Sequence, residues 1–330
     1  MTEPGLYIDP DDNDPGRWAH SLMHHAEILI PCLEAAEAKS VVEVGAYAGD
    51  LTGVLVEWAA GRDARVWAID PSPQDRLVRL AEESPNLELV RDTSLAALPG
   101  LPDMDAVIID GDHNYYTVFH ELRIIGERAS GSDLPLLMFH DVSWPHGRRD
   151  DYYAPEAIPD EYRQPIAEGG GLFPGEPGVR SGGLPYRRSA AREGGPRNGV
   201  LTAVEDFVAE DEDRRLAVVP VFFGLGVVWH REAPWADRVA ELVAPWDRNP
   251  MLERLEANRV LHLAAGHHHM IHSLQLQERK ARQETLLRRL LESSAFSIAE
   301  RLSRLRQRLG IAPKQTVVSK DDIRRVLKND

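Results

Sequence analysis

Cysteine is nearly absent from this sequence: Cys32 is the single one among 330 residues. One cysteine excludes an intramolecular disulfide and any cysteine-rich zinc site, and it is typical of a reducing compartment. No run approaches the roughly 18 uncharged apolar residues that a transmembrane helix needs. The first residues carry neither a basic segment nor an apolar one, so no secretory signal is expected there. Together these absences predict a cytoplasmic protein.

Positive charge is also scarce. The chain holds 38 Lys and Arg against 53 Asp and Glu, a formal net charge of −15, which argues against a nucleic-acid-binding surface spread over the whole chain. The imbalance is uneven, because residues 251–330 hold 16 Lys and Arg against 9 Asp and Glu. The sequence therefore predicts an acidic body and a basic tail. Its length allows one large domain or two modest ones.

The first half of the body alternates strand and helix patterns. We expect residues 1–16 to form a loosely packed arm, followed by a helix from Trp18 to Ala38 that Pro31 kinks or divides. The expected strands are 40–45, 64–70, 87–91, 105–110 and 134–139, and the expected helices are 51–60, 74–84 and 115–129. Unbroken apolar strands separated by helices predict an α/β, Rossmann-like, doubly wound and mostly parallel sheet.

The second half begins with residues 142–199, which are rich in Gly, Pro, Arg and Tyr. A segment this long is typical of a lid or an acceptor-binding insertion, with a flexible surface loop as the alternative. A helix over 200–210 and strands over 216–223 and 226–230 follow, and Gly224-Leu225-Gly226 allows a late antiparallel hairpin. From about residue 250 the pattern is helical, with a second helix ending at Gly310 and a last one capped by Ser319.

A glycine-containing turn, EVGAYAG, lies between the first expected strand and its helix. Gly45 and Gly49 let the backbone turn sharply and approach a ligand, although they could serve only helix–strand packing. The spacing is not GxGxxG, and Glu43 disfavours a phosphate while favouring a cation. S-adenosylmethionine (SAM) fits this preference, because it carries an ammonium and a sulfonium group. Asp70 can hold ribose hydroxyls, and Asp92 lies where adenine contacts are expected.

Acidic and imidazole side chains follow the next two strands. The fourth strand ends in Asp110-Gly111-Asp112-His113 and the fifth in His140-Asp141. Carboxylates side by side in one crevice favour a hard divalent cation such as Mg²⁺, which could bind a diol and lower a hydroxyl pKa. His113 could then take the proton. The alternative is that Asp112 or His113 only caps the following helix.

These motifs resemble known families. EVGAYAG, AIDPS and LVRDTS resemble the cofactor motifs of class I SAM-dependent methyltransferases over about residues 38–142. IDGDHNYY and FHDV resemble the sugar and small-molecule O-methyltransferases of the macrocin, mycinamicin and cephalosporin-cluster type. The resemblance implies a cofactor site made by Glu43, Gly45, Ala46, Tyr47, Gly49, Asp70, Asp92 and Asp110. It also implies metal ligation by Asp110 and Asp141 and a general base at His113. His140 stands where those relatives carry an acid, and an imidazole shifts the preference toward ions such as Mn²⁺.

We therefore expect a metal-assisted SAM-dependent O-methyltransferase that acts on a hydroxyl of a sugar-containing or polyhydroxylated small molecule or glycan. The expected organisation is an arm and helix over 1–38, a methyltransferase domain over 39–235, and a basic helical extension over 236–330. Acceptor contacts are expected from Trp144, Arg148, Tyr152 and Tyr153, and the arginines of the insertion could bind anionic groups.

Two other functions stay open at this stage. One is a non-catalytic member of the fold that serves as an assembly partner in glycan or natural-product biosynthesis. The other is an NAD(P) oxidoreductase, which Glu43 and the missing GxGxxG oppose. We expect no nucleic-acid partner, and the C-terminal helices could support a homo-oligomer. The His267-His268-His269 tract is expected on a helix surface or an interface, and not in a metal site.

Overall fold

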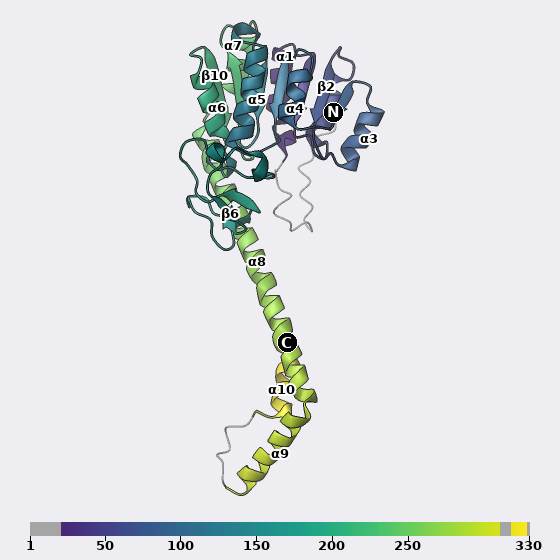
Figure 1. Cartoon of the computed structure of the whole chain (residues 1–330), viewed down its shortest axis with the longest axis vertical. Coiled ribbons are helices and arrows are strands. Elements are labelled where there is room, and N and C mark those ends of the chain that lie inside the picture. Colours follow the sequence, from purple (N-terminus) through teal and green to yellow (C-terminus); the bar gives the residue numbers. More distant parts are fainter. Residues whose placement is uncertain (1–20, 311–317, 329–330) are drawn as a thin grey trace. The chain divides into compact units, whose positions relative to one another are not determined.

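The computed structural model describes residues 21–310 and 318–328, so the predicted arm and Trp18 lie outside the described residues. The chain divides into two compact units, Met1–His267 and His268–Asp330. Figure 1 shows the elements of both units, coloured along the chain.

The first unit is built on a seven-stranded sheet with the strand order β10-β11-β5-β4-β1-β2-β3. Its strands are β1 (Ser40–Val44), β2 (Arg65–Ile69), β3 (Leu87–Val90), β4 (Ala106–Ile109), β5 (Leu136–Phe139), β10 (Arg214–Val219) and β11 (Leu225–His230). The first five run parallel, whereas β11 is antiparallel to both β5 and β10. The predicted mostly parallel sheet with a late antiparallel hairpin is therefore confirmed.

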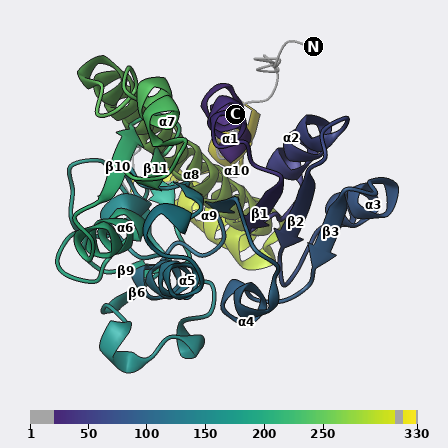
Figure 2. The same ribbon diagram turned by 90° about the horizontal axis from the view of Figure 1, so that it is seen from above.

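Helices cover both faces of this sheet, so β4 and β5 are apolar throughout and β1 has Glu43 as its one buried charged residue. On one face pack α1 (Ala26–Ala35), α2 (Asp50–Ala59), α3 (Asp75–Glu83) and α7 (Ala236–Val243). On the other pack α5 (Tyr115–Arg128) and α6 (Val200–Ala209), beside the short α4 (Ser94–Ala97). Figure 2 shows this layering from above. Successive β1 residues alternate between the two cores, Val41 in the first and Val42 in the second, as strand geometry requires.

Most predicted elements lie within two residues of the observed ones, with one expectation narrowed and one wrong. Pro31 does not divide its helix, because α1 runs through it after a short 3-10 turn, η2 (Leu22–His25). The expected strand 216–223 ends early at Val219, and Gly226 lies inside β11. The turn instead contains Phe222 and Phe223, whose φ angles are 50° and 67°. Side-chain hydrogen bonds from a distant helix hold this turn.

That helix is α8 (Pro250–Glu292), whose first turns belong to the first unit. The Glu256 carboxylate accepts the backbone N–H groups of Phe222 at 3.1 Å and Phe223 at 2.9 Å. Arg259 donates two hydrogen bonds of 2.7 Å to the same carboxylate and lies over the Phe223 ring. A fixed charge pair thus stabilises a left-handed turn that two phenylalanines adopt at a cost.

The insertion 142–199 is ordered, with short 3-10 turns and two small antiparallel pairs. These pairs are β6 (Ile166–Glu168) with β9 (Arg188–Ala190) and β7 (Gly171–Leu172) with β8 (Leu184–Pro185). The 3-10 turns are η5 (His146–Arg148), η6 (Pro155–Ala157) and η7 (Asp160–Tyr162), and two more lie earlier in the chain, η3 (Leu98–Gly100) and η4 (Gly131–Asp133). Buried Asp150 accepts the backbone N–H groups of Tyr115 and Gly199, so its carboxylate joins the insertion to α5 and α6.

The second unit contains the rest of α8, α9 (Ser294–Arg308) and α10 (Lys320–Lys328). The Ser293 side chain caps α9 by accepting the N–H of Phe296. Ser319 caps α10 as predicted, because its hydroxyl accepts the N–H of Asp322 while the Asp322 carboxylate accepts the N–H of Ser319. Among the described residues, none of the helices has the length and apolar character needed to cross a bilayer.

Candidate active site

The carboxyl ends of β1, β2, β4 and β5 open onto one cavity of about 1050 Å³, and every described residue that lines it belongs to the first unit. The loop after β1 contributes Gly45 and Tyr47, and Asp70 lies at the end of β2. Asp110 to His113 follow β4, and His140 and Asp141 follow β5. The sheet therefore brings the predicted cofactor loop and the predicted metal ligands to one edge.

The loop after β1 is shaped by close backbone approach. Gly45 has a φ of 86°, and a Cβ atom there would lie 2.2 Å from the Asp110 carbonyl oxygen. Gly49, with a φ of 78°, is the N-cap of α2. The Asp70 carboxylate holds the loop by accepting the N–H of Tyr47 at 2.7 Å and that of Ser72 at 2.7 Å. Both carboxylate oxygens keep further lone pairs that face the cavity side of the loop.

Four predicted cofactor residues, Glu43, Ala46, Gly49 and Asp92, lie outside the cavity lining. Glu43 is buried on the α2 side of β1 and accepts the Thr52 hydroxyl at 2.6 Å; burial raises its pKa to about 8. Ala46 is buried beneath the loop. Asp92 is exposed and accepts the N–H of Thr93, while the cavity is lined by Thr93, Ser94 and Leu95.

Two carboxylates and two imidazoles meet beyond β4 and β5. The His113 Nε2 atom lies 3.1 Å from Asp141 Oδ2 and 3.8 Å from Asp110 Oδ1. The His140 Nδ1 atom lies 3.1 Å from Asp110 Oδ1 and 3.4 Å from Asp141 Oδ2. Asp141 has a φ of 59°, a left-handed conformation that is uncommon for a residue other than glycine. This strained backbone turns the Asp141 carboxylate toward both imidazoles.

The electrostatics of the cluster couple these four groups. Burial disfavours the charged form of His113, yet the Asp141 and Asp110 carboxylates outweigh burial and raise its pKa to about 9. The same carboxylates raise the pKa of His140 against its burial. Burial would raise the pKa of Asp141, but the two imidazoles hold it well below its usual value. The carboxylates therefore require positive charge beside them.

The residues fit a divalent cation. The ligand atoms of Asp110, His113 and Asp141 all lie within 4.8 Å of one another. Oxygen-ligated ions with bonds of about 2.0–2.6 Å span about 4–5 Å between opposite ligands. His140 adds a second favourable feature, because its Nε2 atom lies 2.9 Å from the Phe222 carbonyl oxygen. A metal-binding imidazole commonly donates its other ring N–H to a carbonyl group, and a bound ion would replace the present contact of Nδ1 with Asp110.

The acceptor side of the cavity differs from the prediction. Tyr153 lines it, whereas Trp144, Arg148 and Tyr152 are not among the lining residues. Arg148 instead pairs with Glu205 on α6, and the buried Tyr152 hydroxyl donates to Asp150.

Sequence reasoning missed several residues on this side. They are Asp112, His146, Asp151 and His267, of which His267 was expected on a helix surface. Burial raises the pKa of Asp151 to about 6 and lowers that of His146 to about 3. For Asp112, His146 and Asp151 the only advance signal was their proximity in sequence to the strand-end motifs, and His267 had no such signal. The helix after β4 is capped by Asn114, and not by Asp112 or His113.

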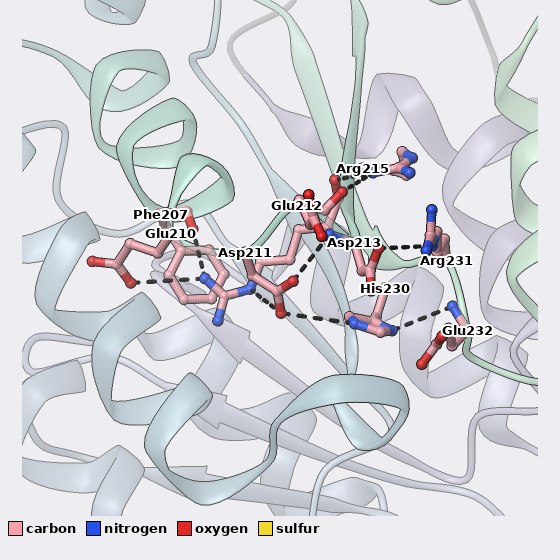
Figure 3. Close-up of polar contacts among 10 residues, drawn as sticks. Phe207, Glu210, Asp211, Glu212, Asp213, Arg215, His230, Arg231 and Glu232 are labelled. Atoms are coloured by element: carbon pink, nitrogen blue, oxygen red, sulfur yellow. Dashed lines mark hydrogen bonds and ion pairs between the residues drawn. The ribbon is translucent and has the colours of Figure 1, made fainter.

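A second acid–imidazole cluster lies at the opposite end of β10 and β11, where Asp211, Asp213 and His230 approach one another (Figure 3). Arg231 pairs with Asp213 at 2.7 Å, and Arg214 lies 3.9 Å from Asp211. His230 Nδ1 accepts the N–H of Glu232 at 3.2 Å, so the ring proton must be on Nε2. With its carboxylates paired and its imidazole nitrogens both engaged, this cluster lacks the free ligand atoms of a metal site.

The comparisons with known proteins agree with this fold. Residues 42–142 match the family model described as a methyltransferase domain. No curated protein matches the chain. Among solved structures, the chain resembles the methyltransferase PaMTH1 of Podospora anserina, bound to S-adenosylhomocysteine (SAH), with 14% identity over 64% of this chain and 80% of that one and a TM-score of 0.39.

Two further structures are described as O-methyltransferases. TomG from Streptomyces achromogenes, solved with SAM, is 15% identical over 68% of this chain and 92% of that one, with a TM-score of 0.37. A putative caffeoyl-CoA O-methyltransferase from Staphylococcus aureus is 10% identical over 62% and 81%, with a TM-score of 0.37. The family match covers residues 42–142, which hold β2 to β5 and the strand-end residues from Gly45 to Asp141 that line the cavity, so this part of the chain resembles a methyltransferase domain.

Proposed function

We propose that this protein is a divalent-metal-assisted O-methyltransferase that methylates a hydroxyl group of a sugar-containing or polyhydroxylated acceptor. One observation carries the proposal. A single cavity is lined at one end by Gly45, Tyr47 and Asp70 and at the other by Asp110, His113 and Asp141. A cofactor in the first part would therefore have its reactive end beside the acid–imidazole cluster.

The cofactor end suits an uncharged ribose and a cationic methionine group. SAM supplies a methyl group on a sulfonium, which an acceptor oxygen must approach in line. Asp70, already fixed by two backbone N–H groups, would accept the ribose hydroxyls with its remaining lone pairs. Glu43 would act from beneath the loop, where the nearby ammonium group would favour its ionised form. The roles of Ala46, Gly49 and Asp92 stay predictions.

At the metal end of the cavity, the two imidazoles have different proposed roles. Asp110, His140 and Asp141 would hold Mg²⁺ or Mn²⁺, whose charge would orient two acceptor oxygens and lower the pKa of one hydroxyl. His113 is the less enclosed imidazole, and its Nε2 atom faces the cavity between both carboxylates. We assign it the proton of the acceptor hydroxyl, because the cation would take up the charge of the two carboxylates that raise the His113 pKa to about 9 without it. Proximity and exclusion of water then contribute more than acid–base strength.

Calorimetric titration tests this proposal without a known acceptor. We expect SAH to bind, and Asp70→Asn to weaken that binding by about tenfold, as expected for the loss of charged hydrogen bonds. Mn²⁺ should bind the SAH complex, and its paramagnetic spectrum should change in Asp141→Asn and His140→Gln. The His113→Gln protein should keep its Mn²⁺ affinity if His113 is a base and lose it if His113 is a ligand.

Asp213→Asn is the matched control, since it removes one carboxylate from the acid–imidazole cluster outside the cavity. A protein that binds no SAH would contradict the enzyme assignment and favour the non-catalytic assembly partner. Binding of NADH without binding of SAH would favour an oxidoreductase. SAH binding without any Mn²⁺ or Mg²⁺ binding would retain the methyltransferase and remove the metal.

A further inference from the structure

The acceptor half of the cavity is acidic, and none of the described lining residues is Lys or Arg. Four aspartates line this half: Asp110, Asp112, Asp141 and Asp151. The proposed cation would compensate Asp110 and Asp141. Asp112 and Asp151 would then face the acceptor with no fixed positive charge of the protein among the described lining residues.

Hydrogen bonding leaves the same two carboxylates incomplete. Asp151 is about nine-tenths buried, and its Oδ1 atom has no hydrogen-bond partner within residues 21–310 and 318–328. The Oδ1 atom of Asp112 is also buried without a partner, although its Oδ2 accepts the Thr117 hydroxyl at 2.8 Å. A buried carboxylate oxygen without a donor is costly, so both carboxylates, which line the cavity, are suited to a ligand that brings N–H or O–H groups to their cavity side.

The arginines of the insertion do not offset this charge. Arg148 pairs with Glu205, and the fully buried Arg149 donates to the carbonyl oxygens of Ala190 and Pro177. Arg188 donates to the Tyr153 carbonyl oxygen. The expectation that this segment binds anionic groups therefore finds no arginine at the cavity wall, and a phosphate or carboxylate on the acceptor would lie beside Asp112 and Asp151 with only the imidazoles of the described lining residues to offset them.

We propose that the acceptor carries a protonated amine, and that Asp112 and Asp151 bind this ammonium group beside the reacting hydroxyl. The inference rests on the proposed methyltransferase function and adds the chemical class of the acceptor: a hydroxyl compound with a basic nitrogen, such as an amino sugar. An ammonium group supplies up to three N–H donors and the missing charge. The Tyr153 ring, which also lines the cavity, supplies an aromatic surface for the same cation.

Three diols of one shape and different charge provide the test: dopamine, 4-methylcatechol and 3,4-dihydroxyphenylacetate, each titrated into the full chain saturated with SAH and Mn²⁺. We expect dopamine to bind about tenfold more tightly than 4-methylcatechol, and the carboxylate analogue to bind more weakly than either, because a charged hydrogen bond is worth about 1.5–3 kcal/mol. Asp151→Asn and Asp112→Asn should each remove most of the dopamine preference while leaving SAH and 4-methylcatechol binding unchanged.

The control variant is Glu241→Gln, which removes one exposed carboxylate on α7 outside the cavity and should preserve the full preference. The proposal is overturned if the carboxylate analogue binds as well as dopamine, if the preference survives in both Asn variants, or if none of the three diols binds. If one of the two Asn variants does not fold, the dopamine preference of the other variant still tests the proposal. Absence of SAH binding at the outset is a different result, because it removes the methyltransferase function itself.

Discussion

At the scale of single residues, Gly45 joins the two halves of the active site. Its missing side chain lets the loop after β1 lie against Asp110 and Gly111, with the Asp110 carbonyl oxygen where a Cβ atom would be. The loop after β1 and the loop after β4, which carries Asp110 and His113, therefore cannot shift independently of each other. Movement of one backbone requires movement of the other.

We predict that Gly45→Ala lowers the free energy of unfolding by about 3 kcal/mol and weakens SAH binding, because the new methyl group meets backbone atoms at a positive φ. Gly53→Ala is the matched control, since a Cβ atom within α2 there would meet nothing within 4 Å. That change should stabilise the protein by about 0.5–1 kcal/mol. Denaturant unfolding followed by circular dichroism measures both. Equal effects of the two variants would contradict the role of Gly45.

The sequence could predict the site residues that lie at strand ends. It could not predict the site residues whose positions depend on how the insertion 142–199 folds. Asp110 and Asp141 follow buried strands whose apolar runs are plain in the sequence, so their meeting follows from parallel pairing. Asp151 and His146 reach the cavity only because the insertion folds around buried Asp150 and Arg149. Those interactions join residues far apart in sequence and leave no periodic pattern.

At the scale of elements, the β10–β11 hairpin shows the same limit. Both strands were foreseeable from their apolar residues, whereas the turn was assigned to the glycines at 224 and 226. The observed turn takes Phe222 and Phe223 into the left-handed region because Glu256 accepts both of their N–H groups. Local propensity places the turn on glycine, and a tertiary hydrogen bond moves it by two residues.

Helix α9 carries an exposed apolar stripe with the spacing of a coiled-coil seam. The stripe consists of Ile298, Leu302, Leu305 and Leu309, each more than half exposed. Arg301, Arg306 and Arg308 take the flanking positions that face a partner helix. Two copies that paired through this stripe would therefore place arginines against arginines.

In the predicted homo-oligomer, the arginines beside the α9 stripe determine whether added salt strengthens or weakens the association of two copies. Association through the α9 stripe should strengthen several-fold when NaCl rises from about 0.05 M to about 0.5 M, because salt screens the repulsion between arginines. Sedimentation velocity measures the effect. Leu302→Glu should abolish the association, whereas Val326→Glu, at an exposed position of α10, should not. Association that weakens with salt would indicate an acidic partner surface in place of a second α9.

At the scale of the whole molecule, the chain combines a catalytic unit with a helical unit. All described residues of the cavity lining precede residue 268, where the second unit begins. The excess of basic residues lies largely in the second unit, so the net charge of the first unit is more negative than the −15 of the whole chain. Cofactor binding is therefore expected to be a property of the first unit alone.

This division predicts that Leu302→Glu and Leu305→Glu in the full chain leave the SAH dissociation constant within about twofold of the parent value, which is less than about 0.4 kcal/mol. Asp70→Asn provides the comparison, since it changes the cofactor end of the cavity directly. Calorimetric titration of SAH into the three variants measures these dissociation constants. A tenfold loss in either leucine variant would mean that the second unit shapes the cofactor site.

The hydrogen bond between His140 and the Phe222 carbonyl oxygen has a consequence for the affinity of the proposed metal site. The Phe222 carbonyl oxygen and the Asp110 carboxylate can only accept, so both ring nitrogens of His140 donate and the imidazole is held in its charged form. The orientation of that carbonyl group depends in turn on Glu256 and Arg259 of α8. Helix α8, which lies outside the sheet, thereby fixes the position of this buried imidazole, so the start of α8 would influence the affinity of the proposed metal site.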